Sequence, residues 1–137
     1  AVCFIGGGET VVSMDLQNQT GSGGRNQELV LSFIQVMNQN KDLILNSSFR
    51  FEFMSCGTDG IDGPTDAGGA LFSYRDLYEG NDIEVDSIEE ALWTHDSYGY
   101  FSRLNGGRNH FKPGHTGTNV LDLHILKIWL EFPKRID

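Results

Sequence analysis

The order of apolar runs and helical segments predicts an α/β fold, in which a mixed β-sheet is flanked by helices in a single compact domain. Three short apolar runs are typical of strands, at residues 1–5, 51–56 and 123–130. A segment with apolar residues at helical spacing, residues 26–38, lies between the first two runs. The chain has 137 residues, of which 39% are hydrophobic, so one domain can bury a sizeable core.

Charge and cysteine content exclude several classes of protein. A formal net charge of −9 argues against a surface that binds nucleic acid or anionic membranes. Cys3 and Cys56 lie in apolar runs, which favours free buried thiols in a reducing compartment. The sequence holds neither an apolar run of about 18 residues nor a secretory signal, so we expect an intracellular protein, cytoplasmic or mitochondrial. Because Ala1 already lies in an apolar run, we expect a domain of a longer protein.

The N-terminal segment predicts a β-hairpin. Residues 1–5 are apolar, residues 10–15 are rich in β-formers, and the glycines 6–8 between them are typical of a tight turn. The same glycines would also allow backbone amides to approach a ligand closely, and the sequence leaves both interpretations open.

The predicted helix over residues 26–38 follows a glycine-rich segment, residues 21–24. A glycine loop that enters a helix is suited to bind an anion, because unpaired N–H groups and the positive end of the helix dipole point the same way. Arg25 stands at this point, and a planar guanidinium suits recognition of phosphate or carboxylate. Alternatively, Arg25 is a surface residue that pairs with Glu28 or a neighbouring carboxylate.

A second glycine-rich loop, residues 57–69, follows the apolar run 51–56 and carries three aspartates. Because ligands in open α/β sheets bind beyond the carboxyl ends of the strands, we expect the glycine loops to face one edge of the sheet. Such carboxylates bind a metal ion or accept a proton, although aspartate and glycine are also common in ordinary turns. Residues 70–72 are compatible with a helix, and Asp66 is suited to cap a helix that begins at Ala67.

The C-terminal half predicts two helices and a closing strand. One helix spans residues 86–93, with Asp86 or Ser87 as its cap, and a second starts near Asp96 and runs to Leu104. The strand spans residues 123–130. His110, His115 and His124 lack the paired spacing of a zinc site, and the place of His124 within the expected strand favours a structural role.

Common nucleotide-binding and calcium-binding motifs are missing from the sequence. It contains no G-x-x-x-x-G-K-[ST] loop, no G-x-G-x-x-G with an acidic residue about twenty positions later, and no EF-hand pattern. A phosphate group would therefore have to bind in another way.

Four segments, in this order, resemble the C-terminal MOFRL domain of class II glycerate kinases. They are residues 6–10 (GGGET), 23–28 (GGRNQE), 57–67 (GTDGIDGPTDA) and 116–120 (TGTNV). The second and third segments are the distinctive ones. The resemblance extends over nearly the whole chain, so we assign residues 1–137 to a MOFRL-like domain of a longer glycerate kinase.

The resemblance implies an ATP-dependent kinase that uses Mg²⁺ and phosphorylates a hydroxyl of D-glycerate. It implies a larger N-terminal α/β domain, with the active site in the cleft between the two domains. This chain would supply one wall and would be inactive alone, and a homodimer is left open. Relatives have also been labelled hydroxypyruvate reductases, a label that the missing dinucleotide fingerprint disfavours.

The resemblance also implies roles for individual residues. Arg25 would bind the glycerate carboxylate or the transferring phosphoryl group, and Asp59 would hold Mg²⁺ or accept the hydroxyl proton, with Asp62 as the other candidate for either role. Asn26 and Glu28 would orient Arg25 or the substrate. The remaining expected contacts to substrate or phosphate are Gly24, Thr58, Gly60, Thr116, Thr118 and Asn119.

Two other functions use the same residues. One is a non-enzymatic module that binds an acidic metabolite or a partner through the glycine loops. The other is a structural metal-binding domain built on Asp59, Asp62 and Asp66.

Overall fold

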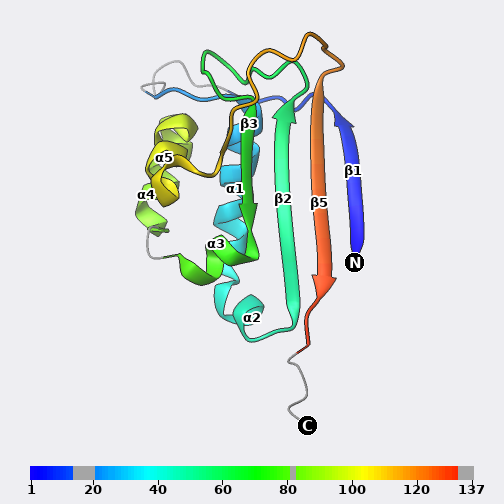
Figure 1. Cartoon of the computed structure of the whole chain (residues 1–137). Helices are drawn as coiled ribbons and strands as arrows, with labels where there is room; N and C mark the ends of the chain where they lie inside the picture. Colours follow the sequence, from blue (N-terminus) through cyan, green and yellow to red (C-terminus); the bar gives the residue numbers. More distant parts are fainter. Residues whose placement is uncertain (14–20, 81–82, 133–137) are drawn as a thin grey trace.

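The C-terminal strand lies inside the sheet and holds its two halves together. The computed structural model describes residues 1–13, 21–80 and 83–132. Five strands form one sheet in the order β1-β5-β2-β3-β4 (Figure 1). Their bounds are Val2–Gly8 for β1, Phe49–Gly57 for β2, Gly69–Ser73 for β3, His110–Phe111 for β4 and Asp122–Leu130 for β5.

All pairs of neighbouring strands in this sheet are antiparallel. The α/β class is as predicted, but the sheet is antiparallel rather than mixed. The reason is the position of β5. Strands β1 and β2 run in the same direction with a helix between them along the chain, as in a parallel unit, but β5 is inserted between them and runs the other way.

The longest helix packs on strands β2 and β3 of the sheet. This helix, α1, spans Arg25–Gln39 and contacts β2 and β3 (Figure 1). The shorter helices are α2 (Lys41–Leu45), α3 (Tyr74–Glu79), α4 (Val85–Trp93) and α5 (Ser97–Arg103), followed by a 3₁₀ turn, η1 (Leu104–Gly107). Helices α4 and α5 pack on α1, so the helices gather on one side of the molecule.

The core lies between α1 and the covered face of β2 and β3. Alternation along β2 buries Phe51 completely and exposes Glu52 on the opposite face. Phe51 meets Phe33 of α1 edge to face, with ring centroids 5.4 Å apart, and lies beside Phe72 of β3. Helix α5 adds the buried ring of Phe101. This apolar layer fixes the position of α1, and therefore of its first turn, relative to the sheet.

The predicted N-terminal hairpin is wrong. Strand β1 continues through the three glycines to Gly8 and pairs along its whole length with β5. Residues 10–13 are not in a strand, and the rest of the expected second strand lies outside the described residues. Backbone pairing with a distant strand needs no side chains, so it overrides the low strand propensity of glycine.

The predicted helix after the aspartate loop is also wrong. Residues 69–73 form β3, which pairs with β2, so Asp66 caps no helix at Ala67. Helix α3 starts later, where Ser73 and Asp76 form a reciprocal capping box. Helix α4 begins one residue earlier than expected, with Glu84 rather than Asp86 or Ser87 at its N-cap.

The other predicted elements are confirmed. Helix α1 matches the expected helix over residues 26–38, and β2 and β5 contain the expected strands. Helix α5 starts as predicted with Asp96 as N-cap, which accepts a hydrogen bond from the backbone of Gly99. Residues 43–45, which are apolar and lie between α1 and β2 in the chain, belong to the short helix α2.

Both cysteines are free thiols, but only one is buried. Cys56 lies in the interior, where burial raises the pKa of its thiol, and Cys3 is exposed on β1. Among the described residues, no helix combines the length and apolarity that a membrane crossing requires.

Replacing Phe51 with alanine should destabilise the fold by about 3–5 kcal/mol, because the side chain is fully buried and its removal leaves a cavity under α1. Denaturant unfolding followed by circular dichroism measures this change. The matched control is Glu52→Ala on the exposed face of the same strand, which should unfold at nearly the wild-type denaturant concentration. Equal midpoints for both variants would contradict this placement of the core.

Candidate active site at the first turn of α1

Four loops gather at one end of the sheet, beside the first turn of α1 (Figure 1). They comprise residues 9–13 after β1, residues 21–24 before α1, residues 58–68 after β2 and residues 112–121 before β5. The sequence predicts that its glycine-containing loops meet at one sheet edge, and the arrangement is as expected.

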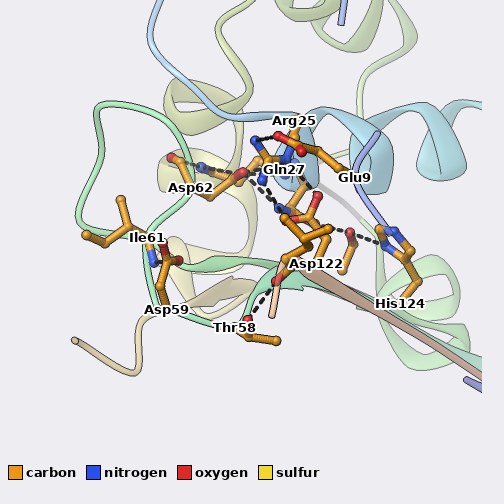
Figure 2. A network of polar contacts seen from close by, with 12 residues as sticks. Glu9, Arg25, Gln27, Thr58, Asp59, Ile61, Asp62, Asp122 and His124 are labelled. Atoms are coloured by element: carbon orange, nitrogen blue, oxygen red, sulfur yellow. Dashed lines mark hydrogen bonds and ion pairs between the residues drawn. The ribbon is translucent and has the colours of Figure 1, made fainter. Parts of the chain in front are cut away.

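The first turn of α1 is capped by a carboxylate from a distant loop. One oxygen of Asp62 accepts hydrogen bonds from the backbone N–H and the side-chain amide of Asn26, at 3.0 and 3.1 Å. The other oxygen accepts from the backbone N–H and the side-chain amide of Gln27, at 2.9 and 3.0 Å (Figure 2). All three residues are at most 2% exposed. The positive end of the helix dipole stabilises the buried charge.

Glycine is required where the two segments approach each other. A Cβ on Gly24, the N-cap residue of α1, would lie 2.3 Å from the carboxyl carbon of Asp62. The adjoining Gly63 has φ of +61° and packs against the backbone of Gly23. These contacts give the two glycine segments a structural reason to face each other.

The expected anion site at the helix terminus is therefore filled by the chain itself. The backbone N–H groups of Asn26 and Gln27, which would hold a phosphate, donate to Asp62. The same contacts do not fit the prediction that Asp62 binds metal or substrate, because both of its oxygens are buried and accept two hydrogen bonds each.

The guanidinium of Arg25 lies between two carboxylates that the sequence does not single out. Its Nε and Nη2 donate to the two oxygens of Asp122 at 2.6 and 3.0 Å, a bidentate pair. Its Nη1 lies 3.1 Å from Glu9, in the loop after β1 (Figure 2). The Asp122 side chain is fully buried, whereas Arg25 and Glu9 are 37% and 52% exposed. Arg25 thus pairs with neighbouring carboxylates, but not with Glu28.

These contacts change the acidity of Asp122. Burial alone would raise its pKa, but hydrogen bonds from Arg25 and Asn26, together with the charge of Arg25, hold the pKa below its usual range. Asp122 consequently stays ionised and keeps the guanidinium in place.

A chain of buried polar groups supports Asn26 from the sheet side. Its amide oxygen accepts a hydrogen bond of 2.6 Å from the hydroxyl of Ser55 on β2. That hydroxyl also lies 2.8 Å from Nδ1 of His124 on β5. Because the Ser55 proton is used on Asn26, the His124 nitrogen donates to the Ser55 oxygen. His124 is therefore part of the support of the site, in line with the structural role expected from its place in a strand.

Glu28, one turn further along α1, contacts a histidine from the corner between α4 and α5. Its two carboxylate oxygens each lie 3.1 Å from Nδ1 of His95. The two side chains are only 17% and 13% exposed.

Asp59 and the loop before β5 (residues 112–121, here called the threonine loop) contact each other rather than Arg25. One oxygen of Asp59 accepts from the backbone of Ile61, and the other accepts from the side-chain amide of Asn119 at 3.3 Å. The hydroxyl of Thr58 donates to the carbonyl of Leu121, and that of Thr116 donates back to the carbonyl of Thr58. Figure 2 shows Asp59 on the outer loop, away from the carboxylates around Arg25.

The two loops touch closely at Gly60. Its φ is +85°, and an added Cβ would lie 1.9 Å from the carbonyl oxygen of Gly114. Thr118 is exposed on the second loop, and its backbone N–H donates to the hydroxyl of Thr116. The residues expected to contact substrate thus form two groups. One lies around Arg25, and the other lies where these two outer loops meet, which we call the rim.

The described residues contain no cluster of three or more histidine, cysteine or acidic side chains that could hold a metal ion. The structural metal domain proposed from the three loop aspartates is therefore not supported. Asp62 caps α1, and Asp66 pairs with Lys112 and Tyr98 on the surface. Asp59 keeps an outward position in which it could supply one carboxylate.

Two cavities of about 250 Å³ each border Arg25. One is also lined by residues 10–13 and by Glu28. The other is lined by residues 21–24, by Gly63 and Pro64, and by His95. Both volumes exceed that of a small hydroxy acid.

Sequence reasoning missed the partners of Arg25 and Glu28. Asp122 directly follows the threonine loop and Glu9 directly follows the triple glycine, so their place beside two glycine-rich segments is the one available signal. His95 and Ser55 carry no local signal, because only the packing of α1 on the sheet and on α5 brings them to the site.

Comparison with known proteins identifies the family. The MOFRL family matches residues 2–122. The chain belongs to the MOFRL family. This confirms the resemblance drawn from the four sequence segments.

Relatives of this MOFRL chain include named glycerate kinases. A glycerate kinase from Mus musculus is 40% identical over 126 residues, which cover 91% of this chain and 22% of the relative. A glycerate 2-kinase from Picrophilus torridus is 39% identical over 122 residues, covering 89% of this chain and 24% of the relative. The crystal structure of a glycerate kinase from Thermotoga maritima matches with a TM-score of 0.66 and 32% identity, over 93% of this chain and 27% of that chain. The MOFRL chain thus spans about a quarter of the length of these relatives.

Removing the carboxylate of Asp62 should destabilise the domain by about 2–4 kcal/mol, because Asp62→Ala leaves the first N–H groups of α1 and two buried amides without an acceptor. Asp62→Asn should lie between Asp62→Ala and wild type. Urea unfolding measures the change, with the exposed Asp66→Ala as matched control, for which we expect a midpoint close to wild type. If Asp62→Ala unfolded together with that control, the capping role would be wrong.

The lowered pKa of Asp122 predicts a specific loss of stability in acid. A carboxyl with a depressed folded-state pKa contributes stability above its unfolded pKa, near 3.9, and loses it as the pH falls through the folded value. The difference in unfolding free energy between wild type and Asp122→Asn should therefore be largest at neutral pH and shrink below about pH 4. Denaturant unfolding at a series of pH values measures it. A constant difference from pH 7 to pH 2 would contradict the Arg25–Asp122 pair.

Proposed function

We propose that this domain forms one wall of the active site of an ATP-dependent glycerate kinase that phosphorylates a hydroxyl of D-glycerate in the presence of Mg²⁺. The proposal is supported by the match to the MOFRL family and by relatives and a solved structure named glycerate kinase. It extends that family membership to a reaction and to particular residues.

The proposal rests on the contacts and surroundings of the Arg25 guanidinium. This guanidinium is held by a fully buried carboxylate on one side and borders two cavities. On its other side, its one ion-pair partner within residues 1–13, 21–80 and 83–132 is the exposed Glu9. An exposed ion pair of this kind contributes little free energy, so an incoming anion can replace Glu9 at Nη1 at low cost. The glycerate carboxylate and the transferring phosphoryl group are both anions that suit this position.

Phosphoryl transfer depends mainly on positioning and on stabilisation of charge. Arg25 supplies charge, and Gly24 and Asn26 fix it in place through the cap that they form with Asp62. The rim provides hydrogen-bonding groups for the substrate or for phosphate when the loops rearrange around a ligand. The proposed rim residues are Thr58, Gly60, Thr116, Thr118 and Asn119.

The carboxylate of Asp59 is a suitable ligand for Mg²⁺, because this ion is commonly held by one or two carboxylates together with phosphate oxygens. Its oxygens accept from Asn119 and Ile61 at the outer face of the loop, whereas Asp62 is enclosed. A bound Mg²⁺ would neutralise charge on the phosphates of ATP. The second carboxylate, where one is needed, would come from outside this domain.

The remaining three quarters of the length of the relatives would supply the other wall of the site. The domain alone should then lack kinase activity. The runner-up function, a non-enzymatic module for an acidic metabolite, uses the same Arg25 and would be preferred if the full-length protein bound D-glycerate without consuming ATP.

Replacing Arg25 with alanine in the full-length protein should lower kcat/KM by about 100-fold or more with ATP, Mg²⁺ and D-glycerate, because a charge that stabilises the transferring group is lost. Arg25→Lys should recover only part of the loss, since an ammonium cannot form the bidentate pair with Asp122. A coupled assay for ADP measures turnover.

The matched control is Arg75→Ala, which removes an exposed arginine from α3 and should leave turnover unchanged. EDTA should abolish activity, and added Mg²⁺ should restore it. Wild-type kcat/KM in a folded Arg25→Ala variant would remove this residue from the site.

A further inference from the structure

His95 occupies a backbone position that disfavours its side chain. It follows Thr94, the C-cap of α4, and its φ is +54°. The backbone N–H groups of His95 and Asp96 donate to the carbonyls of Leu92 and Ala91, which is the Schellman arrangement at the end of a helix. Glycine, or less often asparagine, is the usual residue there, because a Cβ costs about 1–2 kcal/mol in the left-handed region. A histidine at this position suggests that its ring has a role of its own.

The ring of His95 is held in one orientation by Glu28. Nδ1 lies 3.1 Å from both carboxylate oxygens, and both side chains are largely buried. Because a carboxylate only accepts hydrogen bonds, Nδ1 carries a proton and donates it. In a neutral ring, Nε2 is then the basic nitrogen. A carboxylate that orients histidine through Nδ1 is the arrangement that prepares Nε2 to accept a proton in catalytic triads.

His95 borders the same cavity as Arg25. This cavity, of about 250 Å³, is also lined by the backbone of residues 21–24. Arg25 would bind an anionic group in this cavity, and His95 is among the residues that line it. A small molecule with a carboxylate and a hydroxyl can therefore meet a cation and a base within one cavity.

We propose that His95 is a catalytic residue that accepts the proton of the substrate hydroxyl, with Glu28 as its positioning residue. The inference rests on the proposed kinase function and adds the base and the cavity to it. Asp59, the base candidate from the sequence, has both oxygens hydrogen-bonded on the outer loop. His95 is the better placed acceptor, because it shares a cavity with Arg25.

The step balances without a further reactant. Nε2 of His95 takes the hydroxyl proton of the hydroxy acid as the hydroxyl oxygen forms its bond to the γ-phosphorus of ATP. The bond between that phosphorus and the bridging oxygen breaks, and ADP leaves with the electron pair. His95 later returns its proton to solvent. Glu28 holds the ring in place and stabilises the positive charge that forms on it.

Two variants remove the base while keeping the backbone conformation. Glycine and asparagine both favour the left-handed region, so His95→Gly and His95→Asn should fold. In the full-length protein we expect kcat to fall by about 100-fold or more in each, with a smaller change in KM for D-glycerate. Added imidazole should restore part of the activity of His95→Gly. Glu28→Gln, which no longer fixes the tautomer, should also lower kcat.

The control is Thr94→Ala, which removes a hydroxyl hydrogen bond at the neighbouring position and leaves Glu28 and His95 in place. It should keep wild-type kcat. If folded His95→Gly and His95→Asn kept kcat within about twofold of wild type, or lost only thermal stability, His95 would be a structural link between α1 and α5 and the proposal would be overturned. A wild-type protein that binds D-glycerate but does not consume ATP would overturn the kinase function as well.

Discussion

The site depends on one buried interaction, the carboxylate of Asp62 on the first turn of α1. Binding an anion at a helix N-terminus is a common way to hold phosphate, but here the chain provides the anion itself. This interaction joins the first turn of α1 to the loop that follows β2. It thereby fixes where Arg25, the next residue outward on the helix, presents its guanidinium. A change in this cap would shift every contact of that side chain.

The carboxylates around Arg25 differ in exposure, and this difference gives them different tasks. Asp122 is buried and makes a bidentate pair, so it holds the guanidinium whether or not a ligand is bound. Glu9 is half exposed and contacts a single nitrogen, so it can be displaced. Glu28 contacts His95 instead. The acidic surroundings of one cation therefore combine a fixed support with an exchangeable partner.

Local sequence patterns correctly predicted the elements whose formation depends on local interactions. Helical spacing located α1, an aspartate before a serine located the start of α5, and the glycine segments indicated loops that meet at one end of the sheet. The partner of β1, the strand after the aspartate loop and the Arg25–Asp122 pair were missed, because they are set by contacts between distant residues; the last joins residues 97 positions apart. The family resemblance implies the same possible roles for Asp59 and Asp62, and the burial and capping hydrogen bonds of Asp62 distinguish the two.

The insertion of β5 between β1 and β2 has a consequence for how the chain reaches this state. Among the described strands, β1 pairs only with β5, and β2 and β5 form the longest register of the sheet. Strand β1 therefore has no hydrogen-bonding neighbour until β5 has been synthesised. Pairing between strands so far apart in the sequence slows folding. Asp122 is the first residue of β5, so the strand that completes the sheet also delivers the carboxylate that holds Arg25. The Arg25–Asp122 pair can therefore form only when the last strand of the sheet is in place.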